Sequence, residues 1–434
     1  MDAKKRKARR LADRLLGGRW TGQAIATAIG MVRGPRREQF RAELLRDLLA
    51  LGRLYMPTAN ELVDYLLTST PFLKLTAKSI APNLAAPRFT PAKPFATLPI
   101  PRLVAQGELA AWLDLTVEQL DWLADTRRGH RRAEGALQHY HYAFIDKKSG
   151  PPRLIEAPKS RLKAIQRRIL DEILAKVPVH GSAFGFVPGR SCLGGAQRHA
   201  GEAVVAGFDL RHFFPSLKMG RVHGIFRSLG YPAGVTQLLT GLCTTVTPDA
   251  IFLRLPEVLR HDRAIQALYG ARHLPQGAPT SPALANLAAW QLDRRLDGLA
   301  RAAGAHYTRY ADDLTFSGDA AFAARIDAFG CTVETIVGEE GFALNLAKSR
   351  VMRRGTQQRV TGIVVNQHCN IARAEFDRLK AILHNCVRHG PSGQNRAGVP
   401  DFRRHLDGRI AWVAQVNPHR AEKLRRDFDR IVWA

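Results

Sequence analysis

The stretch HYTRYADDLTFSG, residues 306–318, holds two adjacent carboxylates, Asp312 and Asp313. The runs before and after this pair alternate as strands do, and Ser317-Gly318-Asp319, at the end of the second run, is typical of a turn. Two like charges at the bend of a hairpin repel each other unless a cation joins them. Mg²⁺ prefers oxygen ligands and often keeps phosphate oxygens as well. The stretch therefore predicts a metal site, with an ordinary polar turn as the alternative.

A third carboxylate, Asp209, ends the apolar run Ala203–Phe208, which has the length of a strand. A charge at the end of a buried strand is costly without a partner. One acid on a strand and two on a neighbouring hairpin can hold two Mg²⁺ ions. One ion would activate an attacking hydroxyl, and the other would bind a departing pyrophosphate. The alternative for Asp209 is a simple turn cap.

The composition favours a nucleic-acid partner. The 434 residues include 65 Lys and Arg against 38 Asp and Glu, which gives a formal net charge of +27. Such an excess points to a polyanion, with nucleic acid ahead of an anionic membrane surface. No apolar run has the length of a membrane helix, and the N-terminus lacks the pattern of a secretory signal. Five scattered cysteines favour a reducing cytosol over disulfides or zinc, so we expect a cytoplasmic protein without a membrane partner.

Three regions are expected along the chain. Residues 1–95 predict a basic helical extension that opens with a solvated arm and ends in a Pro-rich linker, because prolines exclude continuous helix. Residues 96–366 mix predicted strands and helices, and residues 367–434 predict basic helices.

Four further elements are predicted in the second region. The run 139–156 predicts a hairpin that turns at Lys147–Gly150. The loop Leu274–Pro282 precedes a predicted helix, Ala283–Leu299, and a loop in this place suits a phosphate or a nucleotide. Residues 321–341 predict another helix, and residues 360–366 predict a strand.

Seven segments, in this order, resemble a polymerase palm, and specifically a bacterial reverse transcriptase of the retron type. They cover roughly residues 145–366 and read KKSGPPRLIEAPKSRLKAIQRRIL, GFVPGRS, GFDLRHFFPSL, LPQGAPTSPALANL, RYADDLTFSG, GFALNLAKSR and VTGIVVN. The stretch HLDGRIAWVAQVNP resembles the thumb of that family. One retron element, N-A-x-x-H, departs from the pattern, since residues 195–199 read Gly-Ala-Gln-Arg-His.

The resemblance implies an α+β fold of the right-hand polymerase type. Fingers and an antiparallel palm sheet would occupy residues 96–366, and a helical thumb would occupy residues 367–434. Residues 1–95 would be an N-terminal helical extension outside the family's core.

The resemblance also implies catalytic roles. Asp209, Asp312 and Asp313 would be the catalytic carboxylates that bind the two Mg²⁺ ions. Lys348 matches a lysine that could protonate pyrophosphate, with a plain surface lysine as the alternative.

Four residues match positions that bind the dNTP. Lys147 and Arg153 match fingers residues that grip the triphosphate, and Arg can bind phosphate in a forked geometry. Phe214 matches an aromatic gate that excludes a 2′-OH, although it could also be plain core. Gln276 would support the nucleotide near the primer end.

The last group implied by the resemblance recognises RNA. His199 and the triplet Val360-Thr361-Gly362 match places where retron enzymes are thought to recognise their structured RNA. An ordinary hydrogen-bonded core histidine is the alternative for His199.

The implied function is RNA-templated DNA synthesis from dNTPs on a dedicated structured noncoding RNA, which serves as both primer and template. Priming from an internal guanosine 2′-OH, a branched RNA–DNA product (msDNA), an effector protein from the same locus and a role in antiphage defence would follow. The alternatives are a group II intron type or an untemplated defence polymerase, and a non-catalytic RNA-binding relict. An intron enzyme should carry further domains after the thumb, whereas about 60 residues follow position 375. A relict has no need of three clustered acids.

Overall fold

The computed structural model describes residues 3–16, 20–30, 35–54, 57–76, 87–127, 129–146, 152–254 and 262–433. The chain divides into two compact units. The first comprises Met1–Pro178 and His212–Ala288, and the second comprises Val179–Arg211 and Ala289–Ala434. Both units are therefore assembled from segments that are distant in the sequence. None of the helices in these described ranges combines the length and the apolar character needed to cross a membrane.

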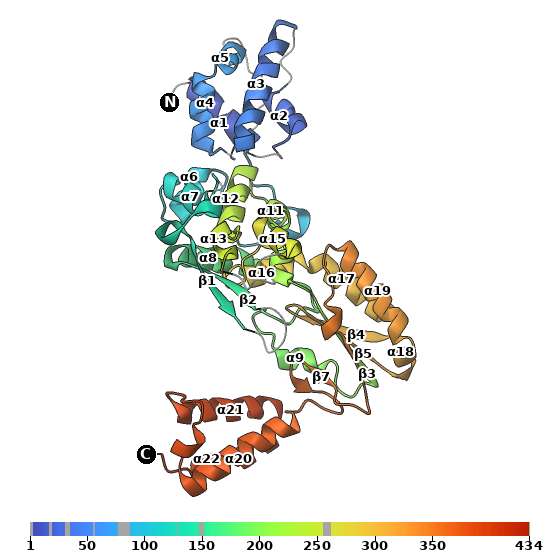
Figure 1. The fold of residues 1–434 in the computed structure, drawn as a ribbon. Coiled ribbons are helices and arrows are strands. Elements are labelled where there is room, and N and C mark those ends of the chain that lie inside the picture. The colour runs from blue at the N-terminus through green and yellow to red at the C-terminus, as the bar shows by residue number, and fades with distance from the viewer. Residues whose placement is uncertain are drawn as a thin grey trace. The chain divides into compact units, whose positions relative to one another are not determined.

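Five helices at the N-terminus pack around a core of their own, shown in blue in Figure 1. The expected solvated arm is wrong, because the basic opening run forms helix α1. Its residues Ala8, Leu11, Ala12 and Leu15 recur at helical spacing and are buried. The density of Lys and Arg around them hides this apolar stripe in the sequence. The five helices are α1 (Ala3–Leu15), α2 (Gly22–Ile29), α3 (Pro35–Leu54), α4 (Ala59–Thr68) and α5 (Thr70–Thr76).

The rest of the first unit is mostly helical and contains one antiparallel hairpin. The hairpin joins β1 (Tyr140–Ile145) to β2 (Arg153–Pro158), as predicted, while its turn lies outside the described residues. The other elements of the unit are η1 (Lys93–Phe95), α6 (Gln106–Trp112), α7 (Val117–Leu123), η2 (His130–Arg132), η3 (Gly135–Leu137), α8 (Ser160–Glu172), η4 (Leu174–Lys176), α10 (Phe213–Ser216), α11 (Met219–Ser228), α12 (Ala233–Cys243), α13 (Asp249–Phe252), α15 (Arg263–Gly270) and α16 (Ser281–Ala288).

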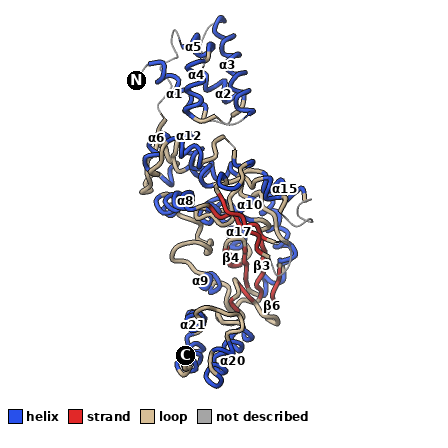
Figure 2. Tube along the Cα trace, turned by 60° about the vertical axis from the view of Figure 1, so that its left-hand side comes forward, coloured by secondary structure: helices blue, strands red, loops and turns tan. Residues whose placement is uncertain are grey.

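The second unit is built on a four-stranded sheet with the order β4-β5-β3-β6, in which every neighbouring pair is antiparallel (Figure 2). Its strands are β3 (Val204–Asp209), β4 (Ala305–Tyr310), β5 (Asp313–Gly318) and β6 (Arg350–Arg353). Phe316 of β5 packs against Tyr307 of β4 and against Phe329 of a covering helix, with ring centroids 4.8 and 5.0 Å apart. These contacts bury the sheet on one face, and the α+β class with an antiparallel palm sheet is confirmed.

Two predicted helices that extend into the second unit are interrupted. The predicted helix 283–299 breaks at Ala289, where the backbone takes φ −86° and ψ 1°, and the predicted helix 321–341 breaks at Arg325. The remaining elements of the second unit are α9 (Cys192–Gln197), α17 (Trp290–Ala302), α18 (Ala320–Ala324), α19 (Ile326–Glu339), η5 (Leu346–Lys348), β7 (Arg359–Val360), β8 (Ile363–Val364), α20 (Arg373–His389), η6 (Ser392–Gln394), α21 (Phe402–Val416) and α22 (Pro418–Asp429).

The strand predicted over residues 360–366 is instead a small hairpin. Strands β7 and β8 pair through Val360 and Ile363, so Thr361 and Gly362 form the two-residue turn between them. Both turn residues have positive φ, 48° and 87°. This is the geometry of a type I′ turn, which matches the twist of the flanking strands. Apolar residues flank Thr361 and Gly362 on both sides, and therefore the stretch has the composition of a single strand in the sequence.

Candidate active site

Strand pairing brings the predicted carboxylates together in the second unit. Asp209 is the last residue of β3 and pairs in register with Asp313, the first residue of β5. The backbone N–H of Leu210 donates to the carbonyl of Asp312 over 2.9 Å. All three carboxylates are thus carried by one end of two adjacent strands, although about 100 residues separate Asp209 from the other two.

Asp209 is held by a segment that follows α19. Asn345 Nδ2 donates to its Oδ1 over 3.1 Å, and Lys348 Nζ lies 2.9 Å from its Oδ2. The backbone N–H of Asn345 also donates to the Asp209 carbonyl over 2.7 Å. The structure therefore places Lys348 beside Asp209 and adds Asn345, while the catalytic role of Lys348 stays a prediction. The sequence contains no signal for that amide, because its partner is 136 residues away.

The turn that carries Asp312 has a strained backbone. Ala311 has a φ of 56°, in the left-handed region that L-residues rarely adopt. Such strain costs about 1–3 kcal/mol and persists only where surrounding contacts determine it. Arg309 supplies one of these contacts, because its Nη1 donates to the carbonyl of Ala311 over 3.1 Å.

Arg309 is itself fixed by a buried ion pair. Its guanidinium binds both oxygens of Asp293 over 2.7 and 2.6 Å, and neither side chain has exposed surface. Tyr307 donates to the same carboxylate over 2.8 Å. Charge-assisted, bidentate hydrogen bonds of this kind fix the orientation of the two side chains. The cluster was missed in the sequence, where Asp293 is one of many acids on predicted helices.

A glycine allows a neighbouring segment to lie against the same turn. A Cβ at Gly185 would lie 2.6 Å from the backbone nitrogen of Ala311, which is closer than real contacts allow. The backbone of this segment also exchanges hydrogen bonds with Arg309: Arg309 donates to the Ser182 carbonyl and accepts from Phe184. The Asp312 turn is therefore supported from two directions.

The electrostatics of the carboxylates indicate a shortage of positive charge. The pKa of Asp313 is raised from 3.8 to about 6, first by removal from water and then by repulsion from Asp312 and Asp209. Lys348 and Arg350 lower it and compensate only in part. A cation near the three acids would relieve this repulsion.

As the side chains stand, no group of three or more His, Cys, Asp or Glu residues within the described ranges is arranged to hold a metal ion. The donor chemistry nonetheless fits one, since hard carboxylate oxygens are the usual protein ligands of Mg²⁺. Asp209 has both oxygens engaged, and one of its partners, Lys348, is half exposed on a flexible side chain. Movement of that side chain would free an oxygen for a metal.

The residues predicted to bind the dNTP belong to the first unit. Arg153 is the exposed first residue of β2, Phe214 lies half-buried in α10, and Gln276 is half-buried in the loop that precedes α16. Lys147 lies outside the described residues. Their roles stay predictions.

His199 lies in the interior of the second unit. It has no exposed surface, and its Nδ1 and Nε2 lie 2.7 Å from Ser317 Oγ and Thr308 Oγ1. The ring thus bridges β5 and β4, and burial is the main reason that its pKa falls from 6.5 to about 3. This arrangement matches the alternative of a hydrogen-bonded core histidine.

The triplet Val360-Thr361-Gly362 has one buried residue and a turn. Val360 is buried, Thr361 is half-buried, and Gly362 is exposed at the tip. Thr361 and Gly362 are thus placed where a partner could reach them, and RNA recognition there remains a prediction.

Comparisons with known proteins agree with the motif order. Residues 145–366 match the family described as "Reverse transcriptase (RNA-dependent DNA polymerase)". The chain is 45% identical over 297 residues to the retron Mx65 reverse transcriptase of Myxococcus xanthus, covering 68% of this chain and 66% of that protein. It is 38% identical over 324 residues to the retron Mx162 reverse transcriptase of the same organism, covering 71% and 63%. The chain thus spans just under two thirds of the length of these two relatives.

Two further similarities differ in strength. The retron Ec86 reverse transcriptase of Escherichia coli is 35% identical over 291 residues, covering 66% of this chain and 79% of that protein. A solved structure of a foamy viral protease-reverse transcriptase in complex with double-stranded DNA aligns over 95% of this chain and 60% of that one. Its TM-score is only 0.33 at 14% identity, so the fold assignment depends on the family match and the strand topology.

Proposed function

Because this chain belongs to the reverse transcriptase family, and within it to the retron type, we propose that it is an RNA-directed DNA polymerase that adds dNTPs to a primer on an RNA template. The observation that carries the proposal is the pairing of Asp209 with Asp313 next to the Asp312 turn. Three carboxylates on adjoining strand ends are what a phosphoryl transfer centre requires.

The cofactor we propose is Mg²⁺, as two ions held by Asp209, Asp312 and Asp313. When bound, the ions would supply Lewis acidity that favours an ionised attacking hydroxyl and neutralises charge on the phosphates. We assign to Lys348 the proton that the leaving pyrophosphate takes up, since its Nζ lies 2.9 Å from Asp209. Asn345 would keep the Asp209 carboxylate oriented through its bond to Oδ1.

The dNTP would be gripped by residues of the fingers. Arg153 offers a guanidinium on an exposed strand start, where it can bind phosphate in a forked geometry. Phe214 would exclude a 2′-OH by size, and Gln276 would support the nucleotide. Lys147 is assigned to the triphosphate on resemblance alone.

The finer proposal is a retron reaction. A dedicated structured noncoding RNA would serve as template and primer, and the product would be a branched RNA–DNA molecule. A role in antiphage defence with an effector protein would follow. The support is the similarity to three proteins named as retron reverse transcriptases. The same similarity favours this reaction over a group II intron type or an untemplated polymerase.

The test is DNA synthesis by the purified protein with RNA transcribed from its own locus and labelled dNTPs. The Asp312→Asn variant keeps the shape of the side chain and removes its charge. Loss of several kcal/mol of transition-state stabilisation predicts a rate about 10³-fold lower. Sequencing the labelled product and its RNA junction would identify template and branch.

The matched control is Asp319→Asn, at the other end of the same hairpin. Asp319 caps α18 by accepting from the N–H of Phe322, and Asn is an equally good cap. This variant should synthesise DNA at the wild-type rate. Unchanged DNA yield in Asp312→Asn would refute the metal-site assignment, and binding of RNA without any incorporation by the wild type would indicate a relict.

A further inference from the structure

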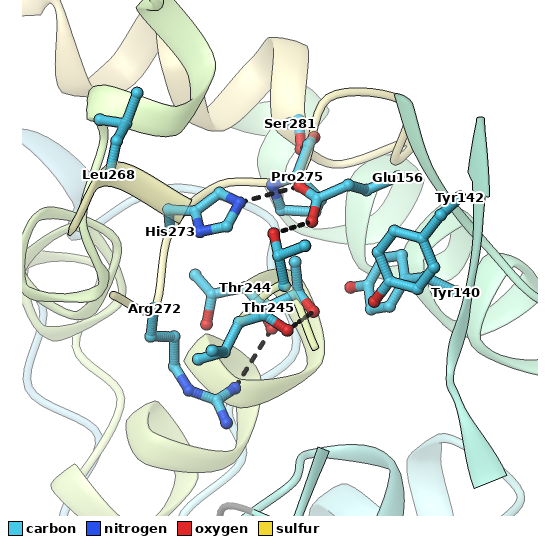
Figure 3. A network of polar contacts seen from close by, with 12 residues as sticks. Tyr140, Tyr142, Glu156, Thr244, Thr245, Leu268, Arg272, His273, Pro275 and Ser281 are labelled. Carbon is cyan, nitrogen blue, oxygen red and sulfur yellow. Dashed lines mark hydrogen bonds and ion pairs between the residues drawn. The ribbon is translucent and has the colours of Figure 1, made fainter. Parts of the chain in front are cut away.

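A polar cluster is buried in the first unit, on the inner face of β2 (Figure 3). Glu156 and His273 have no exposed surface, and Nε2 of His273 lies 2.8 Å from Oε2 of Glu156. Thr247 Oγ1 donates to the other oxygen, Oε1, over 2.7 Å. A buried carboxylate is tolerated only when such partners satisfy it. Nothing in the sequence of the strand, RLIEAP, distinguishes Glu156 from an exposed acid.

The hydrogen bonds of His273 show which of its ring nitrogens carries a hydrogen. Its Nδ1 lies 2.8 Å from the carbonyl oxygen of Ala271. Since a carbonyl oxygen only accepts, Nδ1 carries a hydrogen. The contact between Nε2 and Glu156 then contains one shared proton, whichever of the two groups holds it. The pair is therefore an attractive link between β2 and the segment that begins at His273.

The backbone of Glu156 also bonds to the segment that begins at His273, in addition to the side-chain contact, and we call this segment clamped. Its N–H donates to the carbonyl of Gln276 over 2.8 Å. Gly277 has a φ of 128°, and a Cβ there would lie 3.1 Å from the carbonyl oxygen of Glu156. The loop Pro275-Gln276-Gly277 thus lies directly against β2, at a distance that glycine makes possible. Ser281 Oγ closes the loop by donating to the Pro275 carbonyl over 2.6 Å.

The clamped segment connects the three nucleotide-binding candidates that the structure describes. Gln276 lies in the loop itself. Arg153 is three residues before Glu156 on β2, about 10 Å along the strand at ~3.3 Å per residue. Phe214 lies in α10, and the carbonyl of Leu217, just past the end of that helix, accepts from the N–H of Leu274 over 2.9 Å.

We propose that Glu156, together with His273 and Thr247, is a positioning residue of the nucleotide pocket. It holds the Gln276 loop against the strand that carries Arg153. This inference rests on the proposed function, since it assumes that these two residues bind the dNTP. Glu156 acts through them and does not contact substrate.

The variant that tests the proposal is Glu156→Leu, which removes the carboxylate from both partners. We expect the KM for dNTP to rise about tenfold, equivalent to about 1.4 kcal/mol, with kcat changed less than about threefold. A loss of nucleotide binding that leaves the chemistry intact raises KM in this way. Glu156→Gln should keep KM within about threefold of the wild type. Its amide oxygen can still accept from Thr247, and its N–H can donate to a neutral His273.

Two further variants separate positioning from general stability. Thr247→Val removes one donor at constant size and should raise KM by about threefold, and it stays informative if Glu156→Leu does not fold. Gln166→Leu is the control. Gln166 is buried in the same unit, and its Nε2 donates to Tyr140 Oη and to the Leu242 carbonyl, neither of which belongs to the loop. Its loss should lower Tm without changing the KM for dNTP.

Hydrogen exchange of the backbone amides of residues 274–281 gives a second measurement that does not depend on catalysis. Exchange in this loop should be faster in Glu156→Leu than in Gln166→Leu at equal Tm. Equal exchange, or an equal rise of KM in both variants, would overturn the inference. If the wild type incorporates no dNTP but exchange of the loop is still faster in Glu156→Leu, then the proposed function is wrong. The inference that Glu156 holds the loop would then still be supported.

Discussion

At the residue scale, His199 is a structural bridge whose chemistry depends on its burial. Both ring nitrogens bond to hydroxyls on neighbouring strands, and the side chain has no exposed surface. Burial lowers its pKa from 6.5 to about 3, with His306 and Arg198 adding repulsion. The neutral ring is therefore the form that the folded protein stabilises.

This burial predicts an acid-sensitive contribution to stability. Below pH about 6.5 the unfolded chain binds a proton at His199, whereas the folded protein does so only near pH 3. Stability is therefore lost as the pH falls. Between pH 7 and 5 the wild type should lose about 2 kcal/mol relative to His199→Gln. Urea unfolding at both pH values measures the difference.

The control for this experiment is His384→Gln, which changes an exposed histidine on α20. It should follow the pH dependence of the wild type. If His199→Gln also follows the wild type, then the imidazole is protonated in the folded state and the buried bridge is not neutral.

At the scale of elements, the hairpin of β4 and β5 depends on a cluster outside its own turn. Arg309 joins the Asp293 carboxylate to the Ala311 carbonyl and so supports a backbone with positive φ. The register of β4 and β5 determines which residues pair, whereas the positive φ of Ala311 in the turn is supported by the Arg309 contact. Position 309 therefore connects helix α17 to the turn that carries Asp312.

Replacing Arg309 should allow its contribution to stability to be measured separately from its contribution to DNA synthesis. Arg309→Met leaves Asp293 buried without its partner and should lower the free energy of unfolding by about 3–5 kcal/mol. The double variant Arg309→Met with Asp293→Leu removes both charges and should regain most of that stability. DNA synthesis should stay low in both, because the Ala311 carbonyl has lost its donor. Denaturation and primer extension measure the two effects, and recovery of synthesis in the double variant would show that the turn does not need Arg309.

At the scale of the whole molecule, the net charge of +27 points to phosphate binding. The C-terminal helices offer one place for it, a groove of about 460 Å³ between α20 and α21. Its lining includes Arg404, Arg409 and Trp412 as well as Glu375, so two cations and one acid accompany an aromatic ring on which a base could stack.

The groove predicts a change in the salt dependence of RNA binding. The affinity of the wild type for a labelled single-stranded RNA should fall steeply as salt rises. Arg404→Ala with Arg409→Ala should weaken binding and reduce the slope of log K against log salt by about 1–2.

The control removes the same amount of charge from exposed positions on α20, through Arg373→Ala with Arg378→Ala. Both residues are exposed and lie outside the groove lining. A control slope that drops as much as that of the groove variant would show that net charge matters and the groove does not.

The sequence alone determined the features that depend on local pattern. Alternation around Asp312 predicted the hairpin, the apolar run predicted the strand that ends at Asp209, and the order of motifs predicted a polymerase palm. The capping box of Thr116 and Gln119 at the start of α7 is a feature of the same local kind, because it depends on two residues three positions apart. These features follow from the period of the backbone and from short-range hydrogen bonds, which neighbouring residues are sufficient to specify.

The tertiary structure alone decided the partners of the buried charges. The register that places Asp209 opposite Asp313, the bond of Lys348 to Asp209, and the link of Glu156 to His273 join residues more than 100 positions apart. No local period encodes such pairings, because they depend on how strands align and helices pack. The sequence does not show whether a charged residue is surrounded by water or lies beside a buried partner. Only the fold distinguishes the two cases.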